Sequence, residues 1–269
     1  MKRSLAVASG LALLAVVAGH AGAQGKKITG LTVMQQVEKT NRSKDEVVQA
    51  TMKISKGKTV TKERELTMSA KTAPKYEDRS LIRFTAGDER GTAFLTHQHG
   101  ESADDQWIYL ASLKKTKRLA AGEKKESFVG SDFAYEDLRT ENLDAHTYKL
   151  LGRENVKQIK KQCWKVEAVA KAEDEKASTG YAKRVIWVSS DDNLVRRIDY
   201  YSKDSGKLMK SQFFSRFTTK KDWKGFKRPG RAVMINKTTN TKTEFLFKER
   251  KINEGVKDDM FSERGLEKG

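Results

Sequence analysis

The sequence predicts a mainly β protein whose strands form an antiparallel meander. From Val47 onward apolar and polar residues alternate with a period of two, which is typical of strands that bury one face. Turn signals such as Asp204-Ser205-Gly206 separate these segments at intervals of roughly eight to twelve residues. Helical segments do not alternate with the strands, so a parallel sheet is not expected.

The elements follow from this pattern in chain order. A short amphipathic helix is expected first, because Leu31, Met34 and Val37 recur every three residues after Gly30. Two more helical stretches are expected at 132–138 and 256–261. The segments with strand character are 49–55, 63–70, 76–84, 92–97, 106–110, 116–120, 148–152, 162–170, 183–188, 195–201, 207–217, 232–236 and 243–248.

The N-terminus has the three parts of a secretory signal peptide. Lys2 and Arg3 precede an apolar run of about fifteen residues, and Ala21-Gly22-Ala23 forms an A-x-A cleavage site. The run is shorter than the roughly eighteen residues that span a bilayer, so a retained anchor is the weaker alternative. We therefore expect residues 1–23 to be a signal peptide cleaved after Ala23, and the mature protein to be periplasmic.

The rest of the chain is expected to form one domain over residues 24–269. The chain has 269 residues and only two prolines, so no proline-rich linker divides it. Its single cysteine, Cys163, excludes an intrachain disulfide and a cysteine-based metal site. Because this cysteine lies far from the cleavage site, a lipid anchor at the mature N-terminus is not expected.

The chain is strongly basic. Its 54 Lys and Arg against 36 Asp and Glu make a formal charge of +18, and loss of Lys2 and Arg3 would leave +16. In an exported protein this charge favours anionic lipid head groups over nucleic acid as a partner. The basic residues are dispersed in short groups, so solvated strand faces account for most of them, and a functional basic patch is the alternative.

The alternation also predicts which side chains share a face of the sheet. One face is expected to be aromatic and apolar, and the opposite face charged. The pairs expected on apolar faces are Val185 with Trp187, Ile198 with Tyr200, and Phe245 with Phe247. Since few helices are available to cover such a face, a curled sheet with a partly filled apolar concavity is one solution. A fully packed core without a cavity is equally compatible with the pattern.

The sequence shows no pattern of a catalytic, cofactor or metal site. It has no Gly-rich phosphate loop, G-x-S-x-G or H-E-x-x-H. His97 and His99 would share one strand face, but no carboxylate or thiolate follows at a spacing that recurs in metal sites. Cys163 is flanked by strand residues and is interpreted as a core residue. A secreted hydrolase is therefore the weakest hypothesis, and no enzyme, cofactor or metal is expected.

Two segments carry a resemblance. Residues 105–119 read DQWIYLASLKKTKRL, and residues 127–138 read SFVGSDFAYEDL. Together they resemble the outer-membrane lipoprotein-sorting protein family, whose members read W-x-Y-L-P-x-L-K-K-x-R-R followed by G-S-D-F-x-Y-E-D-L. Ala111 departs from the family's proline. Weaker similarity continues through 183–188, 197–201 and 261–266, so the resemblance extends over most of the mature chain.

This resemblance implies an unclosed β-barrel, or half-barrel, with a few helices lidding an apolar cavity that receives acyl chains. It implies a non-catalytic periplasmic carrier or chaperone for lipid or lipoprotein cargo on its way to the outer membrane. Further partners would be an exporter of the resistance-nodulation-division (RND) type, an outer-membrane receptor or an anionic membrane surface. The alternative is a protein-binding adaptor or envelope-stress sensor on the same fold.

Aromatic side chains on shared faces are the candidates for contact with an acyl chain, and core packing is the alternative for each. These candidates are Trp107, Tyr109, Phe133, Tyr135, Trp187, Tyr200, Phe245 and Phe247. The stretch 132–138 is expected to be a short lid helix capped by Ser131 or Asp132. Its acidic residues are expected to lie beside the basic strand 114–118, so that the two segments dock onto each other.

Overall fold

The computed structural model describes residues 27–100, 102–156, 160–171 and 179–268. The expected signal peptide, residues 1–23, lies outside the described residues. None of the helices in the described ranges is long and apolar enough to cross a bilayer.

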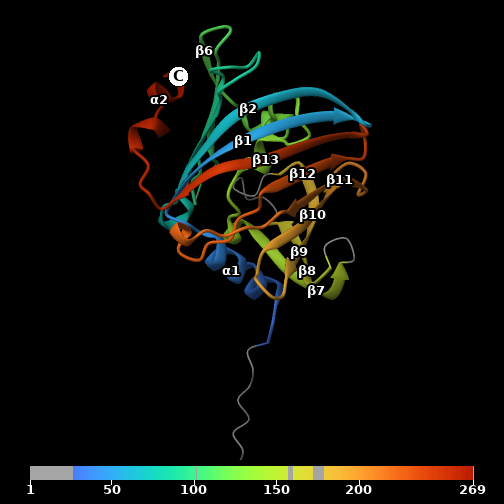
Figure 1. Cartoon of the computed structure of the whole chain (residues 1–269). Coiled ribbons are helices and arrows are strands. Elements are labelled where there is room, and N and C mark those ends of the chain that lie inside the picture. The colour runs from blue at the N-terminus through green and yellow to red at the C-terminus, as the bar shows by residue number, and fades with distance from the viewer. Residues whose placement is uncertain (1–26, 101, 157–159, 172–178, 269) are drawn as a thin grey trace, which may run out of the picture.

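All strands of the described chain form one antiparallel sheet of 13 strands that is not closed into a barrel (Figure 1). The predicted fold class, a mainly β half-barrel, is confirmed. Each of the thirteen expected strands is present, with ends that differ by a few residues. The strands are β1 Asp45–Lys56, β2 Thr59–Lys71, β3 Arg79–Phe84, β4 Ala93–His97, β5 Asp105–Leu110, β6 Lys115–Arg118, β7 His146–Val156, β8 Lys161–Ala170, β9 Tyr181–Ser189, β10 Val195–Ser202, β11 Leu208–Ser215, β12 Arg231–Asn236 and β13 Thr241–Ile252.

The order of the strands shows where the barrel is open. The sheet runs from β6 through β1, continues through β13, and ends at β7. The first and last strands of the chain therefore pair in the middle, whereas β6 and β7, which are consecutive in sequence, form the two edges. The connection between these edges, residues 119–145, crosses the concave side of the sheet (Figure 1).

This crossing segment fills part of the concavity with its own aromatic side chains. Phe128, Phe133 and Tyr135 are buried in one cluster with inner residues of both halves of the sheet. The Phe133 ring lies 5.0 Å from the ring of Phe245 on β13, and the Tyr135 ring lies 5.0 Å from that of Phe94 on β4. Edge-to-face and tilted ring pairs at this distance are favourable contacts.

Helix α1, Gly30–Asn41, covers the other end of the concavity and confirms the predicted N-terminal helix. Thr29 caps the helix, because its hydroxyl accepts a hydrogen bond from the Thr32 backbone N–H. Val33 and Met34 are buried against apolar residues of β8 and β9. The helix can approach β7 closely because its first residue, Gly30, has no side chain.

The sheet also buries apolar residues on its convex face, which corrects the prediction of one apolar and one charged face. The C-terminal helix α2, Glu263–Glu267, brings Leu266 onto a convex cluster that contains Trp107. In β9, Trp187 pairs across the ladder with Arg197 and shares its face, so Val185 and Trp187 lie opposite Ile198 and Tyr200. Residues 185–188 are all apolar, so their alternation does not show whether the odd-numbered or the even-numbered residues of β9 lie on the concave face.

The two other expected helices form only in part. In the stretch 132–138 only a 3₁₀ turn over Tyr135–Leu138 is helical, and Ala134 rather than Ser131 or Asp132 precedes it. In the stretch 256–261 a 3₁₀ turn spans Asp258–Phe261 and leads into α2.

Candidate functional site

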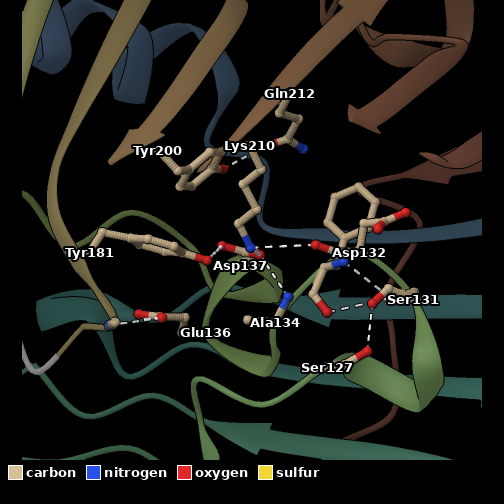
Figure 2. Close-up of polar contacts among 12 residues, drawn as sticks. Ser127, Ser131, Asp132, Ala134, Glu136, Asp137, Tyr181, Tyr200, Lys210 and Gln212 are labelled. Carbon is tan, nitrogen blue, oxygen red and sulfur yellow. Dashed lines mark hydrogen bonds and ion pairs between the residues drawn. The ribbon is translucent and has the colours of Figure 1, made fainter. Parts of the chain in front are cut away.

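The crossing segment is tied to β13 through Asp132. The Asp132 carboxylate accepts hydrogen bonds from the hydroxyls of Thr241 and Thr243, the second at 2.7 Å. The Thr243 hydroxyl in turn accepts from the Asp132 backbone N–H at 2.9 Å. The G-S-D part of the segment is therefore held on the inner face of the sheet, and Figure 2 shows Asp132 close to Asp137 and Lys210.

Asp137 forms the central contact of the segment. Its carboxylate lies 2.6 Å from the ammonium of Lys210 on β11, and the side chains are only 1% and 5% exposed. The Tyr181 hydroxyl and the Ala134 backbone N–H donate to the same carboxylate at 2.8 and 2.7 Å (Figure 2). A buried ion pair with its remaining lone pairs satisfied holds its partners in one arrangement.

Glu136 and Glu141 continue this polar network toward β9. Glu136 accepts a hydrogen bond from the Gly180 backbone N–H at 2.9 Å, and burial raises the pKa of its carboxyl. Glu141 forms a bidentate pair with Arg184 at 2.7 and 2.8 Å and accepts from the Tyr148 hydroxyl. Burial acts to raise the pKa of Glu141, but the Arg184 charge outweighs it and lowers the pKa to about 2.

These contacts correct the expected arrangement of the two segments. The acidic residues of 132–138 pair with β11, β9 and β13, and not with the basic strand β6. In that strand Lys117 pairs with Glu123, and Arg118 pairs with Asp105. The segments share apolar contacts instead, since Ile108 and Leu119 belong to the same inner cluster as Phe133. The sequence did not indicate Lys210 as a partner, because it lies 73 residues from Asp137.

Among the described residues, two cavities in the concavity lie beside the crossing segment. The larger has a volume of about 460 Å³ and lies between α1, the inner faces of β1 to β3 and β13, and the end of the crossing segment. Its larger apolar lining residues are Met34, Val37, Val48, Met68, Ile82, Leu138, Leu143 and Phe247. The smaller, of about 320 Å³, lies against β9 to β11, and Met34, Val37 and residues 139–141 border both.

The predicted acyl-contact residues divide into three groups. Tyr200 lines the smaller cavity and Phe247 the larger one. Phe133, Tyr135 and Phe245 are buried in the inner cluster that fills the remainder of the concavity. The other candidates, Trp107, Tyr109 and Trp187, lie on the convex face away from both cavities, which corrects the expectation for these three.

Sequence reasoning missed most of the aliphatic lining. Val48, Met68 and Ile82 lie at adjacent inner positions, since Val48 pairs with Met68, and Met68 with Ile82. Their alternation within each strand was visible in the sequence. The predicted contact residues are all aromatic and do not include these aliphatic ones, and only the curvature of the sheet shows that these positions lie on the concave face.

In the described ranges no three His, Cys, Asp or Glu side chains are grouped to hold a metal ion. The Cys163 thiol is buried on the convex face beside Trp187, and burial raises its pKa to about 11. A thiol with that pKa is protonated at neutral pH and is a weak nucleophile.

Comparison with known proteins shows the family of this chain and solved structures with a similar fold. A protein family described as "Uncharacterized protein" matches residues 76–268, and the chain belongs to this family. A domain assigned to outer membrane lipoprotein sorting, from Vibrio parahaemolyticus, is similar at 25% identity and TM-score 0.80, over 88% of this chain and 98% of that one. The resemblance to the lipoprotein-sorting family is thereby confirmed.

Two further solved structures are similar. A DUF1329 family protein from Desulfovibrio piger shares 28% identity at TM-score 0.80, over 88% of this chain and 97% of that one. A LolA superfamily protein from Nitrosomonas europaea shares 17% identity at TM-score 0.69, over 89% and 100% of the two chains, and this likeness concerns the fold alone. No curated protein matches the sequence.

Proposed function

We propose that the protein is a non-catalytic carrier that binds the acyl chains of a lipid or lipoprotein in its concavity. The observation that carries the proposal is the larger cavity, with its lining of aliphatic side chains and Phe247. Its volume of about 460 Å³ lies in the usual range of ligand sites. Each methylene group moved there from water contributes about 0.8 kcal/mol, so an acyl chain can bind with little directed polar chemistry.

The polar groups beside the cavities support a binding role over a catalytic one. Asp132, Asp137 and Glu141 each hold the crossing segment against a strand, through Thr243, Lys210 and Arg184 respectively. A catalytic carboxylate needs access to the reacting group. These three carboxylates use their hydrogen bonds to hold the crossing segment in place, which supports a role in shaping the cavity.

We further propose the setting in which the carrier acts. The N-terminal sequence supports export and cleavage after Ala23, so that residues 24–269 act in the periplasm as one domain. In this setting the cargo would travel toward the outer membrane, with an RND-type exporter or an outer-membrane receptor as its partner. The similarity to a lipoprotein-sorting domain supports this direction of transport.

The test is lipid capture by the mature protein and its loss when the cavity is filled. Native mass spectrometry of protein from its own periplasm is expected to show about one acylated molecule per chain. A fluorescent fatty acid is expected to bind the purified protein, and Met68→Trp, which fills the lining, is expected to weaken binding at least tenfold. The control is Val60→Trp, at a side chain on the same strand with 50% exposure, which should change nothing.

Two outcomes would contradict the proposal. One is a protein that is isolated empty and does not take up fatty acids. The other is equal loss of binding in both tryptophan variants. Either would favour the alternative in which the groove recognises a protein partner, as in an adaptor or an envelope-stress sensor.

A further inference from the structure

One wall of the larger cavity carries a buried group of charges. Arg228 and Arg250 both bind the carboxylate of Glu46: the Arg228 Nε lies 2.8 Å from Oε2, and an Arg250 Nη lies 3.2 Å from Oε1. The side chains of Arg228, Arg250 and Glu46 are 8%, 5% and 17% exposed, respectively. All three residues line the cavity.

Two guanidinium groups therefore share one carboxylate. The remaining hydrogen bonds of Arg228 and Arg250 go to neutral oxygens, among them the backbone carbonyls of Asn41 at 2.7 Å and Pro229 at 3.3 Å. The Nη1 of Arg228 is buried and has no hydrogen-bond partner within the described ranges. A buried donor without a partner is costly, which adds to the cost of burying these two guanidinium groups.

The other charged side chains of this cavity have close partners of their own, away from Glu46. Arg42 pairs with Asp78, and Arg139 with Asp104. Glu141 pairs with Arg184. Glu38 lies 3.8 Å from Arg42, so Arg42 is shared by two carboxylates and a surplus negative charge lies on the α1 side of the cavity. The group formed by Arg228, Arg250 and Glu46 is therefore left with one surplus positive charge.

This surplus lies directly beside the apolar lining. Val48 pairs across the sheet with Arg250 on β13 and with Met68 on β2, so one row of inner positions passes from a guanidinium to two apolar side chains. Glu46 precedes Val48 by two residues and shares its face of β1. A ligand with a charged end and an apolar chain would find matching surfaces next to each other.

We propose that the larger cavity selects acyl ligands that carry an anionic group, with that group at Arg228 and Arg250 and the chain along Val48, Met68 and Phe247. The inference rests on the proposed carrier function and names its ligand class. Guanidinium groups bind carboxylates and phosphates through paired N–H donors, so both head groups fit the same chemistry.

The lowered pKa of Arg250 shows that its positive charge is only partly compensated by Glu46. Burial lowers the pKa of this guanidinium to about 10, the Glu46 charge offsets part of that effect, and the Arg228 charge adds to it. An anion bound beside the two guanidinium groups would stabilise both positive charges.

The first experiment compares ligands of equal chain length on the mature wild-type protein. Isothermal titration measures the affinities for laurate, methyl laurate and dodecyl phosphate. The two anions are expected to bind at least about tenfold more tightly than the ester, since a charge-assisted hydrogen bond in a buried site has about that effect. The ratio of laurate to dodecyl phosphate affinity then distinguishes a carboxylate ligand from a phosphate ligand.

Variants change the surplus charge in both directions. Arg250→Met leaves a balanced pair of Glu46 and Arg228, and its preference for laurate over the ester is expected to fall to within about twofold. Glu46→Gln adds to the surplus, and its preference is expected to rise above that of the wild type. The control, Lys251→Met, removes one positive charge at a position with 70% side-chain exposure and should keep the wild-type preference.

The outcomes separate this inference from the function on which it rests. Equal affinity of the wild type for laurate and methyl laurate would overturn the anion preference and leave the carrier proposal standing. Binding of none of the three ligands would overturn both. The comparison of ligands on the wild type tests the anion preference even where a variant does not fold. A loss of preference in Lys251→Met as large as that in Arg250→Met would also overturn the inference.

Discussion

Asp137 shows how a residue of the shared sequence motif acts through a buried contact. It pairs with Lys210, and this pair joins the crossing segment to β11 in the interior of the half-barrel. Two further donors, the Tyr181 hydroxyl and the Ala134 N–H, complete the shell of its carboxylate. Its acidic character is therefore required for the architecture of the concavity.

We expect Asp137→Asn to destabilise the protein by about 3 to 5 kcal/mol, because it leaves the Lys210 charge buried without its partner. The free energy of unfolding in urea measures the change. The matched control is Glu65→Gln, which breaks the ion pair with Lys248 where both side chains are about half exposed. That change is expected to cost less than about 1 kcal/mol. Equal effects of the two variants would contradict the structural role of Asp137.

Glu141 makes stability depend on pH in the acid range. Its pKa in the folded protein is lowered from 4.5 to about 2, mainly because Arg184 outweighs the effect of burial. Between these values the unfolded chain binds more protons than the folded one, so stability falls as the pH falls from about 4.5 to 2. Its full contribution is present above about pH 5.

We expect Glu141→Gln to lose this part of the pH dependence while it is less stable at neutral pH. Urea unfolding of both proteins between about pH 2 and 6 measures the effect. An identical slope of stability against pH in the two proteins would contradict the assignment of the low pKa to Glu141.

At the scale of elements, the placement of α1 depends on the close approach of two backbones. A Cβ atom on Gly30 would lie 2.7 Å from the backbone carbonyl of Tyr148 on β7. The helix thereby brings Val37 to the border of both cavities. Its position sets the width of the concavity at this end.

We expect Gly30→Ala to displace the N-terminus of α1 from β7 and to cost about 1 to 3 kcal/mol, as overpacking does elsewhere. Hydrogen exchange of the α1 amides and urea unfolding measure the effect. The control is Gly122→Ala, where a Cβ atom meets nothing within 4 Å. Faster exchange in α1 of the Gly30 variant is the expected result, and unchanged exchange would contradict it.

At the scale of the whole molecule, the half-barrel results from a meander whose ends pair in the middle. Because β1 pairs with β13, the opening falls between β6 and β7, and the connection between these two edges crosses the concave side. One segment thus partly fills the concavity and leaves the two cavities beside it.

The charge of the whole molecule carries a prediction about membranes. With a formal charge of +16 after loss of Lys2 and Arg3, the mature protein is expected to bind vesicles that contain phosphatidylglycerol and to release them when salt is raised to about 0.5 M. Vesicle co-sedimentation measures this binding. Neutral phosphatidylcholine vesicles are the control, and equal binding to both would exclude an electrostatic contact.

The fold was largely predictable, because its signals are local. Thirteen strands and α1 follow from alternation, helical spacing and turn residues, each of which acts within a few positions of the chain. The short stretch 132–138 was less predictable, since its conformation depends on contacts of Asp132 and Asp137 with distant strands. There a 3₁₀ turn replaces the expected helix.

The candidate site was predictable only in kind. Five of the eight aromatic candidates lie on the concave side, while Trp107, Tyr109 and Trp187 lie on the convex one. A strand's sequence shows which residues share a face, but not which face becomes concave. The same holds for Arg228 and Arg250, whose common partner Glu46 lies far away in the chain.

The amino-acid sequence alone determined the class of this protein: a β meander with one N-terminal helix and the two segments shared with lipoprotein-sorting proteins. Only the tertiary structure decided which side chains face the cavities, where the barrel opens, and which charges are left with too few partners. The physical reason is distance along the chain. Alternation and turn geometry arise between neighbours, whereas a cavity and its buried charges arise from strands that the curling of the sheet brings together.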